Sequence, residues 1–335
     1  MPAPKVSVLL PFRDAAETLE ETLQSLFDQT EERWELVAVD DGSTDDSAAR
    51  IQRSGDPRVR LLPSPGRGIV DALNAGISAC GAPWIARMDA DDRCHPERLE
   101  AQLALACERP ELSVIGCRVR AVPEQAVTDG MRHYLEWLNH LIDPEDIARG
   151  ILVESPIAHP SAMIRTAALE AIGGYRDGDF PEDYDLWLRL HGAGHLLGKV
   201  DRVLLEWREG DHRLSRRDPR YRPEAFRALK ARALARDWLG ERREVQIWGA
   251  GPDGKRWRKA LLEEGVKVLR FFDIDPRKIG GRVAGEVPVI DSREVDSHRG
   301  TPLLGAVGVK GAREEIRAAL SNLGWVESSD HLFVQ

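Results

Sequence analysis

Cysteine is scarce in this sequence, with four among 335 residues. None of them forms a CxxC pair or precedes the histidine spacing of a zinc site, so a disulfide framework and a structural zinc are both disfavoured. We therefore expect isolated thiols, buried or at the surface, in a reducing compartment. They are Cys80, Cys94, Cys107 and Cys117.

A long apolar segment is also missing. No run approaches the roughly 18 apolar residues that would indicate a membrane-spanning helix. The N-terminal Met-Pro-Ala-Pro-Lys leads into a strand-like run without the charged and then apolar pattern of a signal segment. We expect a cytoplasmic protein that contacts a membrane at most peripherally.

Positive charge is outweighed by negative charge. The sequence has 47 Lys and Arg against 56 Asp and Glu, a net charge of −9. Binding to nucleic-acid phosphates needs a positive surface, so this balance argues against a nucleic-acid partner. One stretch, 202–236, is rich in basic residues. It either faces anionic lipid or a diphosphate-linked lipid acceptor, or it is a solvated helix face.

The order of apolar runs predicts an α/β protein. Strand-like runs at 6–10, 34–39, 59–62 and 84–88 alternate with helical patterns at 15–27, 43–51 and 68–79. This βαβαβαβ order is typical of a parallel sheet with helical crossovers. Beyond residue 110 we expect strands at 112–119 and 196–205, and helices at 131–141, 183–191 and 221–239.

The length of the chain and a second βα alternation predict two domains. The last 95 residues begin again with a strand at 245–248, a glycine-rich turn, a helix to 264 and a strand at 268–272. We expect a first domain over 1–220, a connecting helix over 221–240, and a smaller Rossmann-like domain over 241–335.

Acidic residues follow several of the expected strands of the first domain. In parallel sheets ligands sit outside the carboxyl ends of the strands. One such aspartate is an ordinary helix cap, but several at one edge repel each other and stay ionised together only near a cation or hydrogen-bond donors. These residues are Asp14, Asp40, Asp41, Asp89, Asp91 and Asp92.

Two motifs carry a resemblance to a known family. Val-Asp-Asp-Gly-Ser-Thr-Asp at 39–45 and Ala-Arg-Met-Asp-Ala-Asp-Asp at 86–92 resemble those of the family 2 glycosyltransferases, which have the GT-A fold. Further matches are 8–14, 72–77, 96–102 and 182–190, in the family's order. The resemblance covers about 4–217 and implies a GT-A fold there, and the smaller Rossmann-like domain would follow it.

The resemblance implies a divalent metal, manganese or magnesium, beside the nucleotide-sugar. Such a hard cation neutralises the departing nucleoside diphosphate and prefers carboxylate oxygens. By resemblance Asp91 is the metal ligand, and Asp89 contacts the ribose or the metal's water. Asp92 is the alternative candidate for the metal ligand. In the segment 207–215, His212 is a further ligand or an exposed loop histidine.

The resemblance also implies a nucleotide site. It places Asp40 at the base and Asp41 at the turn or the ribose; without it, the Asp-Asp-Gly-Ser-Thr-Asp segment reads equally well as a turn with a helix cap. Pro11 and Asp14 lie at the end of the first strand, where Asp14 replaces the commoner Asn. An ionised carboxylate only accepts hydrogen bonds, so its contact differs. Arg67 either binds phosphate or is a solvated loop arginine.

The Glu182-Asp183 pair supplies the base by the same resemblance. An inverting transfer needs a carboxylate that takes the proton of the acceptor hydroxyl, a role that falls to Asp183 with Glu182 orienting it. Both also suit a helix N-terminus, where the macrodipole favours carboxylates. His159 either lines the acceptor side or packs in the interior.

The second domain carries the spacing of a dinucleotide fingerprint. Gly249, Gly251 and Gly254 follow a strand and open a helix, and Asp273 ends the next strand. The segment has neither cysteine nor tyrosine, which excludes a Tyr-x-x-x-Lys proton donor. We expect either a ligand site, with the ligand unknown, or a structural role.

The resemblance therefore implies an inverting glycosyltransferase. By the same resemblance it would move a sugar from a UDP-linked donor to a hydroxyl of a glycan or lipid-linked glycan in bacterial surface polysaccharide synthesis. Two alternatives remain at this point. One is an inactive nucleotide-sugar-binding scaffold, and the other is a bifunctional enzyme whose C-terminal domain modifies sugars with NAD.

Overall fold

The computed structural model describes residues 2–64, 66–210 and 218–335. Contacts between residues divide the chain into two compact units, Met1–Ile147 with Pro156–Asp218, and Ala148–Ser155 with Pro219–Gln335. Each unit contains its own sheet. No helix within the described ranges is both long and apolar enough to cross a bilayer. All four cysteines are free thiols.

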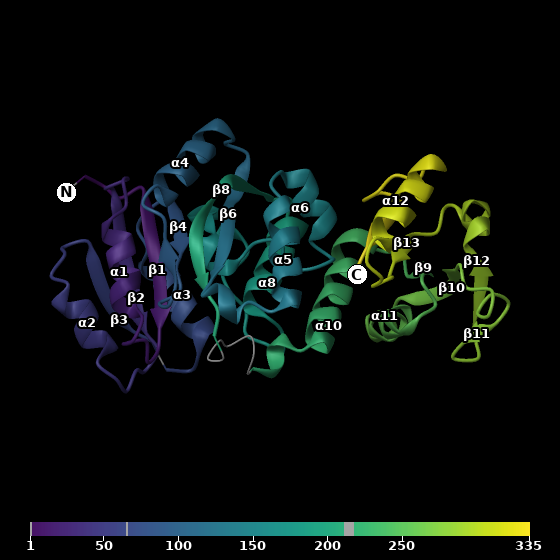
Figure 1. Cartoon of the computed structure of the whole chain (residues 1–335), viewed down its shortest axis with the longest axis horizontal. Helices are drawn as coiled ribbons and strands as arrows, with labels where there is room; N and C mark the ends of the chain where they lie inside the picture. Colours follow the sequence, from purple (N-terminus) through teal and green to yellow (C-terminus); the bar gives the residue numbers. More distant parts are fainter. Residues whose placement is uncertain (1, 65, 211–217) are drawn as a thin grey trace. The chain divides into compact units, whose positions relative to one another are not determined.

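Four parallel strands form one half of the larger sheet, which confirms the alternation expected from the sequence. The elements are β1 (Val6–Phe12), α1 (Leu19–Phe27), β2 (Trp34–Asp40), α2 (Ser47–Arg53), β3 (Val59–Pro63), α3 (Ile69–Ala79) and β4 (Trp84–Arg87) (Figure 1). The strand order is β3-β2-β1-β4. All seven residues of β1 are buried, as expected for a central parallel strand.

The other half of this sheet mixes strand directions. Its elements are β5 (Arg93–Cys94), α4 (Arg98–Glu108), β6 (Leu112–Val122), α5 (Asp129–His140), α6 (Pro144–Gly150), β7 (Met163–Arg165), α7 (Thr166–Ala171), α8 (Glu182–Gly192) and β8 (Leu196–Arg208). Beyond β4 the order is β7-β6-β8-β5. β7 is antiparallel to both β4 and β6, whereas β6 and β8 are parallel. β6 and β8 both run longer than expected, because they pair with each other almost along their whole length.

Helix α3 packs directly on the parallel half of the sheet. A methyl group added at Gly76 would stand 2.1 Å from Cδ1 of Leu9 and 3.0 Å from Cγ2 of Val39. Only glycine allows this approach without movement of the two side chains. The contact fixes the helix, and with it the loop before it, against the ends of β1 and β2.

The second unit is built on a six-stranded sheet with the order β11-β12-β10-β9-β13-β14. Its elements are α10 (Pro223–Ala233), β9 (Glu244–Trp248), α11 (Pro252–Glu263), β10 (Lys267–Asp273), β11 (Arg282–Val283), β12 (Val287–Asp291), β13 (Leu303–Gly305), α12 (Ala312–Asn322) and β14 (His331–Phe333). All neighbouring strands are parallel except β11 and β12. The helix expected at 221–239 is α10, which continues as a π-helix over Leu234–Leu239.

The glycine-rich turn joins β9 to α11 through backbone packing. Gly249 has a φ of 113°, a conformation that side chains disfavour. A methyl group at Gly254 would stand 1.8 Å from the carbonyl oxygen of Gly249, whereas one at Gly251 would meet nothing within 4 Å. Of these glycines, Gly254 is therefore required for the close approach of helix and strand.

This difference predicts unequal effects of two alanine substitutions. Gly254→Ala should lower the free energy of unfolding by about 1–3 kcal/mol, because the added carbon overlaps a backbone oxygen. Gly251→Ala, with a φ of −80° and open space, should change it by less than about 0.5 kcal/mol. Hydrogen exchange of the β9 amides in the full chain measures both effects. Equal protection in the two variants would contradict the packing role of Gly254.

Candidate active site

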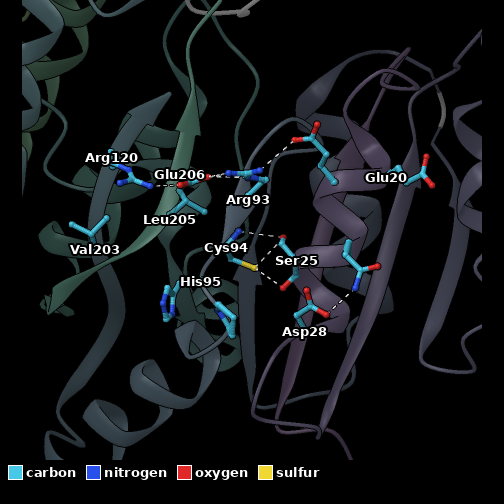
Figure 2. Close-up of a pocket in the computed structure, with 13 residues that line it drawn as sticks. Glu20, Ser25, Asp28, Arg93, Cys94, His95, Arg120, Val203, Leu205 and Glu206 are labelled. Atoms are coloured by element: carbon cyan, nitrogen blue, oxygen red, sulfur yellow. Dashed lines mark hydrogen bonds and ion pairs between the residues drawn. The ribbon is translucent and has the colours of Figure 1, made fainter. Parts of the chain in front are cut away.

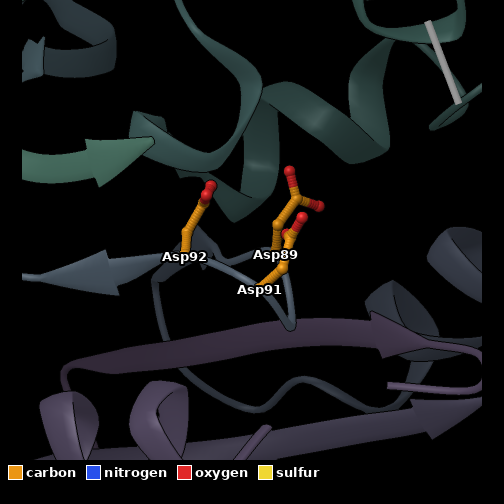
Figure 3. Close-up of side chains that lie close together, drawn as sticks. All are labelled: Asp89, Asp91 and Asp92. Carbon is orange, nitrogen blue, oxygen red and sulfur yellow. The ribbon is translucent and has the colours of Figure 1, made fainter. Parts of the chain in front are cut away.

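Three carboxylates gather on the turn between β4 and β5. One oxygen each of Asp89, Asp91 and Asp92 lies within 4.8 Å of the others. Figure 3 shows their side chains pointing to the same side of the turn. Phe12 and Asp40 are aligned at the ends of β1 and β2, and β4 is parallel to β1. The acidic turn therefore follows the carboxyl edge of the sheet, where the sequence predicted it.

Two threonines, one in α1 and one just before it, hold the backbone of this acidic turn. The Thr22 hydroxyl is buried and lies 2.9 Å from the Ala90 carbonyl and 2.8 Å from the Asp92 carbonyl. Thr18, just before the helix, donates to the same Ala90 carbonyl at 2.9 Å. The turn is thus anchored at its backbone, and its side chains do not have to serve as caps.

Arg208, at the end of β8, is a further anchor. Its backbone N–H donates to Oδ1 of Asp92 at 2.7 Å, and its Nε donates to the Asp91 carbonyl at 2.7 Å. Its guanidinium also pairs with Glu21 at 2.7 Å. This residue links the last long strand of the sheet to the acidic turn.

A buried arginine pairs with the first of the three carboxylates. Arg87 is 3% exposed, and its guanidinium donates to Asp89 and to the Met88 carbonyl. A buried cation beside clustered carboxylates reduces their mutual repulsion. Sequence reasoning missed Arg87, although a charged residue inside the apolar run 84–88 was a usable signal.

The two aspartates after β2 shape the neighbouring loops. Asp40 accepts the backbone N–H of Ser43 at 2.8 Å. Asp41 is buried and accepts the Ser64 hydroxyl at 2.9 Å and the Gly68 N–H at 3.4 Å. Asp41 thereby ties the end of β2 to the loop before α3, and Asp40 is the more accessible of the two.

Asp14 closes the turn at 43–45. Its φ is 49°, and its Oδ1 accepts the N–H groups of Thr44 at 2.7 Å and Asp45 at 3.3 Å. The Thr44 backbone hydrogen bond is the main reason why the pKa of Asp14 lies below its usual value. These contacts need only an acceptor, which accounts for an aspartate where the family commonly has asparagine. The other residue predicted here, Pro11, is buried within β1.

Arg67 pairs with a carboxylate of the helix that follows it. Its Nε lies 2.6 Å from Oδ2 of Asp71 in the first turn of α3, and its side chain is 74% exposed. The guanidinium is thus tethered beside the helix N-terminus while most of its surface stays in solvent.

Glu182 and Asp183 begin helix α8. Asp183 accepts the N–H of Tyr184 at 2.7 Å, and Glu182 is buried. The pKa of Asp183 is raised to about 7, mainly by burial and then by the neighbouring charge of Glu182. Asp89 makes the smallest contribution in the same direction, so the acidic turn and the helix start share one electrostatic environment. A carboxyl group that titrates near neutrality is suited to general base catalysis.

His159 lies in the interior beside two aromatic rings. Its Nε2 is 2.6 Å from the Tyr175 hydroxyl, and its ring meets Trp187 edge-on at 6.0 Å. Burial lowers the pKa of His159 well below its usual value, so the ring is neutral. Asn74 holds Tyr175 in place by binding its backbone N–H at 2.9 Å and its carbonyl at 3.0 Å. Sequence reasoning did not identify Tyr175.

His212 and Asp273 belong to the remaining predicted sites. His212 falls at 211–217, outside the described residues. In the second unit, Asp273 accepts the N–H groups of Ala250 and Asp275, both at 2.9 Å, and pairs with Lys278 at 2.9 Å. Its carboxylate thus braces the glycine-rich turn from the end of β10.

A groove of about 790 Å³ lies elsewhere in the first unit, between α1 and the strands β5 and β8. Figure 2 shows several of its charged side chains paired across the groove. Arg93 and Arg120 both pair with Glu206. None of the predicted catalytic or nucleotide-binding residues lines this groove, so we place no chemistry there.

Comparison with known proteins agrees with this geometry. The sequence model described as Glycosyl transferase family 2 matches residues 7–173, a range that ends before Asp183. The amylovoran biosynthesis glycosyltransferase AmsE of Erwinia amylovora is 31% identical over 216 residues, which are 63% of this chain and 78% of that protein. The putative glycosyltransferase EpsE of Bacillus subtilis is 30% identical over 225 residues, 65% of this chain and 78% of that protein.

A solved structure shares the fold. The crystal structure of S. aureus TarS 1–349 in complex with UDP-GlcNAc has a TM-score of 0.57 at 18% identity, covering 77% of this chain and 71% of that chain. The acidic turn lies at the carboxyl edge of a GT-A sheet, and the matched region covers 78% of both AmsE and EpsE. The chain therefore belongs to glycosyl transferase family 2.

Proposed function

We propose that this glycosyltransferase is inverting and depends on a divalent metal. The observation that carries the proposal is the acidic turn, where three carboxylates converge within 4.8 Å, in one electrostatic environment with a carboxyl group whose pKa is raised. Oxygen ligands at this spacing fit a hard cation such as manganese or magnesium. Asp91 would hold it, with Asp89 beside it, Asp92 in reserve and His212 as a further ligand. When bound, the cation neutralises charge on the departing diphosphate.

The transfer step assigns a role to each acidic residue of α8. The acceptor oxygen attacks the anomeric carbon while the bond from that carbon to the diphosphate oxygen breaks, and Asp183 takes the hydroxyl proton. Burial and the Glu182 charge make Asp183 a stronger base than an exposed aspartate. Glu182 orients it, and His159 lines the acceptor side through its contact with Tyr175.

The donor side is proposed from the loops that follow β1, β2 and β3. Asp40 faces the base, Asp41 and Asp14 hold the loops around the nucleotide, Pro11 lies beneath them, and Arg67 reaches the diphosphate. UDP-GlcNAc in TarS supports a uridine donor. The name of AmsE, an amylovoran biosynthesis glycosyltransferase, supports a glycan or lipid-linked acceptor in bacterial surface polysaccharide synthesis.

The domain division is a further part of the proposal. We assign transfer to 1–220, a connecting role to 221–240 and a Rossmann-like domain to 241–335. The helix α10 falls in the second compact unit, and the basic stretch 202–236 is proposed to provide peripheral membrane contact. A cytoplasmic location suits these assignments.

Nucleotide binding should depend on the metal and on Asp91. UDP with manganese should raise the melting temperature of the wild-type protein, because a ligand at 100 times its Kd stabilises the folded state by about 2.7 kcal/mol. Asp91→Asn should remove most of this shift. Asp143→Asn, at an exposed carboxylate paired with Arg109, is the control and should keep it. No shift with any nucleoside diphosphate on folded protein would favour an inactive scaffold.

Asp183→Asn should separate catalysis from binding. Loss of the base should lower kcat by about 10²- to 10⁴-fold, because amide nitrogen cannot take the hydroxyl proton. The metal-dependent Kd for UDP should stay within about twofold, since Asp183 does not contact the nucleotide in this mechanism. Single-turnover kinetics and calorimetry measure the two quantities. Near-normal turnover in this variant would show that another group is the base.

The pH dependence should follow the ionisation of Asp183. Only the ionised carboxylate accepts a proton, so kcat/KM should fall as the pH drops through the raised pKa, near 7. Glu182→Gln removes a like charge that raises this pKa, so the acid limb should move to lower pH. A limb that stays in place, in a variant that remains folded, would rule out Glu182 as a cause.

A further inference from the structure

A cavity of about 390 Å³ lies entirely within the second unit. It is separate from the glycine-rich turn, because neither Gly249, Gly251 nor Asp273 lines it. Three cations surround it, with one carboxylate and an aromatic wall. The residues that matter are Glu154, Tyr221, Arg227, Lys230, Trp257 and Arg313.

Lys230 is the most buried of the three cations, at 6% exposed. Its Nζ donates to the carbonyls of Val153 at 2.9 Å and Val334 at 3.3 Å, and lies 5.5 Å from the centre of the Trp257 ring. Within the described ranges no carboxylate pairs with it at salt-bridge distance. Its pKa is lowered to about 8, mainly by burial; the charge of Glu154 opposes this shift, and the smaller effects of Arg227 and Arg313 add to it. A buried cation without a counter-ion is unfavourable unless an anion is supplied.

The two arginines leave donors available at the cavity. Nε of Arg313 donates to the main-chain oxygen of Gln335 at 3.0 Å, which uses one of the five N–H groups of the guanidinium. Arg227 has no hydrogen-bond or ion-pair partner among the described residues. Glu154 is the one carboxylate side chain of the cavity lining, and it accepts the N–H of Ser155 at 3.0 Å. The lining side chains therefore carry more positive than negative charge.

Aromatic side chains also line the cavity. Trp257 is fully buried, and its indole N–H has no acceptor in the described part of the chain, as is also true of Trp34 and Trp187 in the first unit. The rings of Tyr221 and Phe226, which both line the cavity, lie 6.4 Å apart, and they provide a surface for a flat or apolar group. A purely structural lysine explains the carbonyl contacts of Lys230, but not the unpaired guanidinium of Arg227.

We propose that this cavity binds a small organic phosphate. The phosphate oxygens accept from Arg227, Lys230 and Arg313, and the organic part packs on Tyr221 and Phe226. Arginine and lysine around one concave site are typical of phosphate recognition, and the volume suits a compact ligand. The site is distinct from the donor site, because all its lining residues belong to the second unit.

Calorimetry on the full chain tests the proposal. Uridine monophosphate, glucose 1-phosphate and inorganic pyrophosphate are titrated separately in EDTA, which removes the metal needed at the proposed donor site. At least one should bind saturably at a single site, and succinate, which has carboxylates but no phosphate, should bind more weakly. Arg227→Gln and Arg313→Gln should each weaken binding about tenfold, as expected for loss of a charge-assisted hydrogen bond.

Two control variants keep the test decisive. Arg232→Gln changes an arginine of the same helix that lies outside the cavity lining and pairs with Glu264 at 3.5 Å, so binding should be unchanged. Asp91→Asn disables the proposed donor site and should also leave this binding intact. Loss of binding in Asp91→Asn, indifference to both lining arginines, or no saturable binding of any of the three phosphates would overturn the proposal.

Discussion

Asp89, Asp91 and Asp92 repel one another, and the surrounding contacts of the first unit compensate for this repulsion. Three carboxylates within 4.8 Å destabilise a fold unless opposite charge and donors compensate them. The protein supplies part of this compensation permanently. The buried guanidinium of Arg87 pairs with Asp89, and the Arg208 backbone donates to Asp92. The remaining negative charge is what the proposed cation would neutralise.

The rigidity of this turn comes from backbone contacts rather than from the carboxylates. Thr18, Thr22 and Arg208 bind its carbonyl groups, and these contacts hold the backbone of the turn in place. Preorganised charge of this kind is effective in catalysis because it needs no rearrangement during the reaction. Asp89 also contributes to the raised pKa of Asp183, after burial and the charge of Glu182, so the acidic turn and the start of α8 interact electrostatically.

In the second unit, the acidic residue beside the glycine-rich turn is paired, and the excess charge is positive. Asp273 is fully engaged with two backbone N–H groups and Lys278, which stabilises the glycine-rich turn. Its unbalanced charge lies instead around Lys230, where cations gather without enough carboxylates to neutralise them. Buried uncompensated charge of either sign is unfavourable, and both units therefore hold charge that a ligand of the opposite sign would neutralise.

Local pattern in the sequence determined the parallel half of the first sheet and the edge at which the acidic residues meet. Strand and helix periodicity are set by neighbouring residues, and the carboxyl ends of parallel strands share one edge. The roles of Asp40, Asp89, Asp91 and Asp183 were then assigned through the family resemblance. Those roles, like the ligand role of Gly249, Gly251 and Gly254, stay predictions, although the backbone clash at Gly254 shows its part in packing.

Only the tertiary structure decided which partners these residues have. The insertion of β7 between β4 and β6, the pairing of Arg87 with Asp89, the contact of His159 with Tyr175 and the tether from Arg67 to Asp71 have no local signature that sequence reasoning used. The cavity around Lys230 likewise joins segments far apart in the chain, Glu154, α10, α11 and the start of α12. Hydrogen bonds, ion pairs and burial depend on distances between such segments, and these are fixed only when the cores pack.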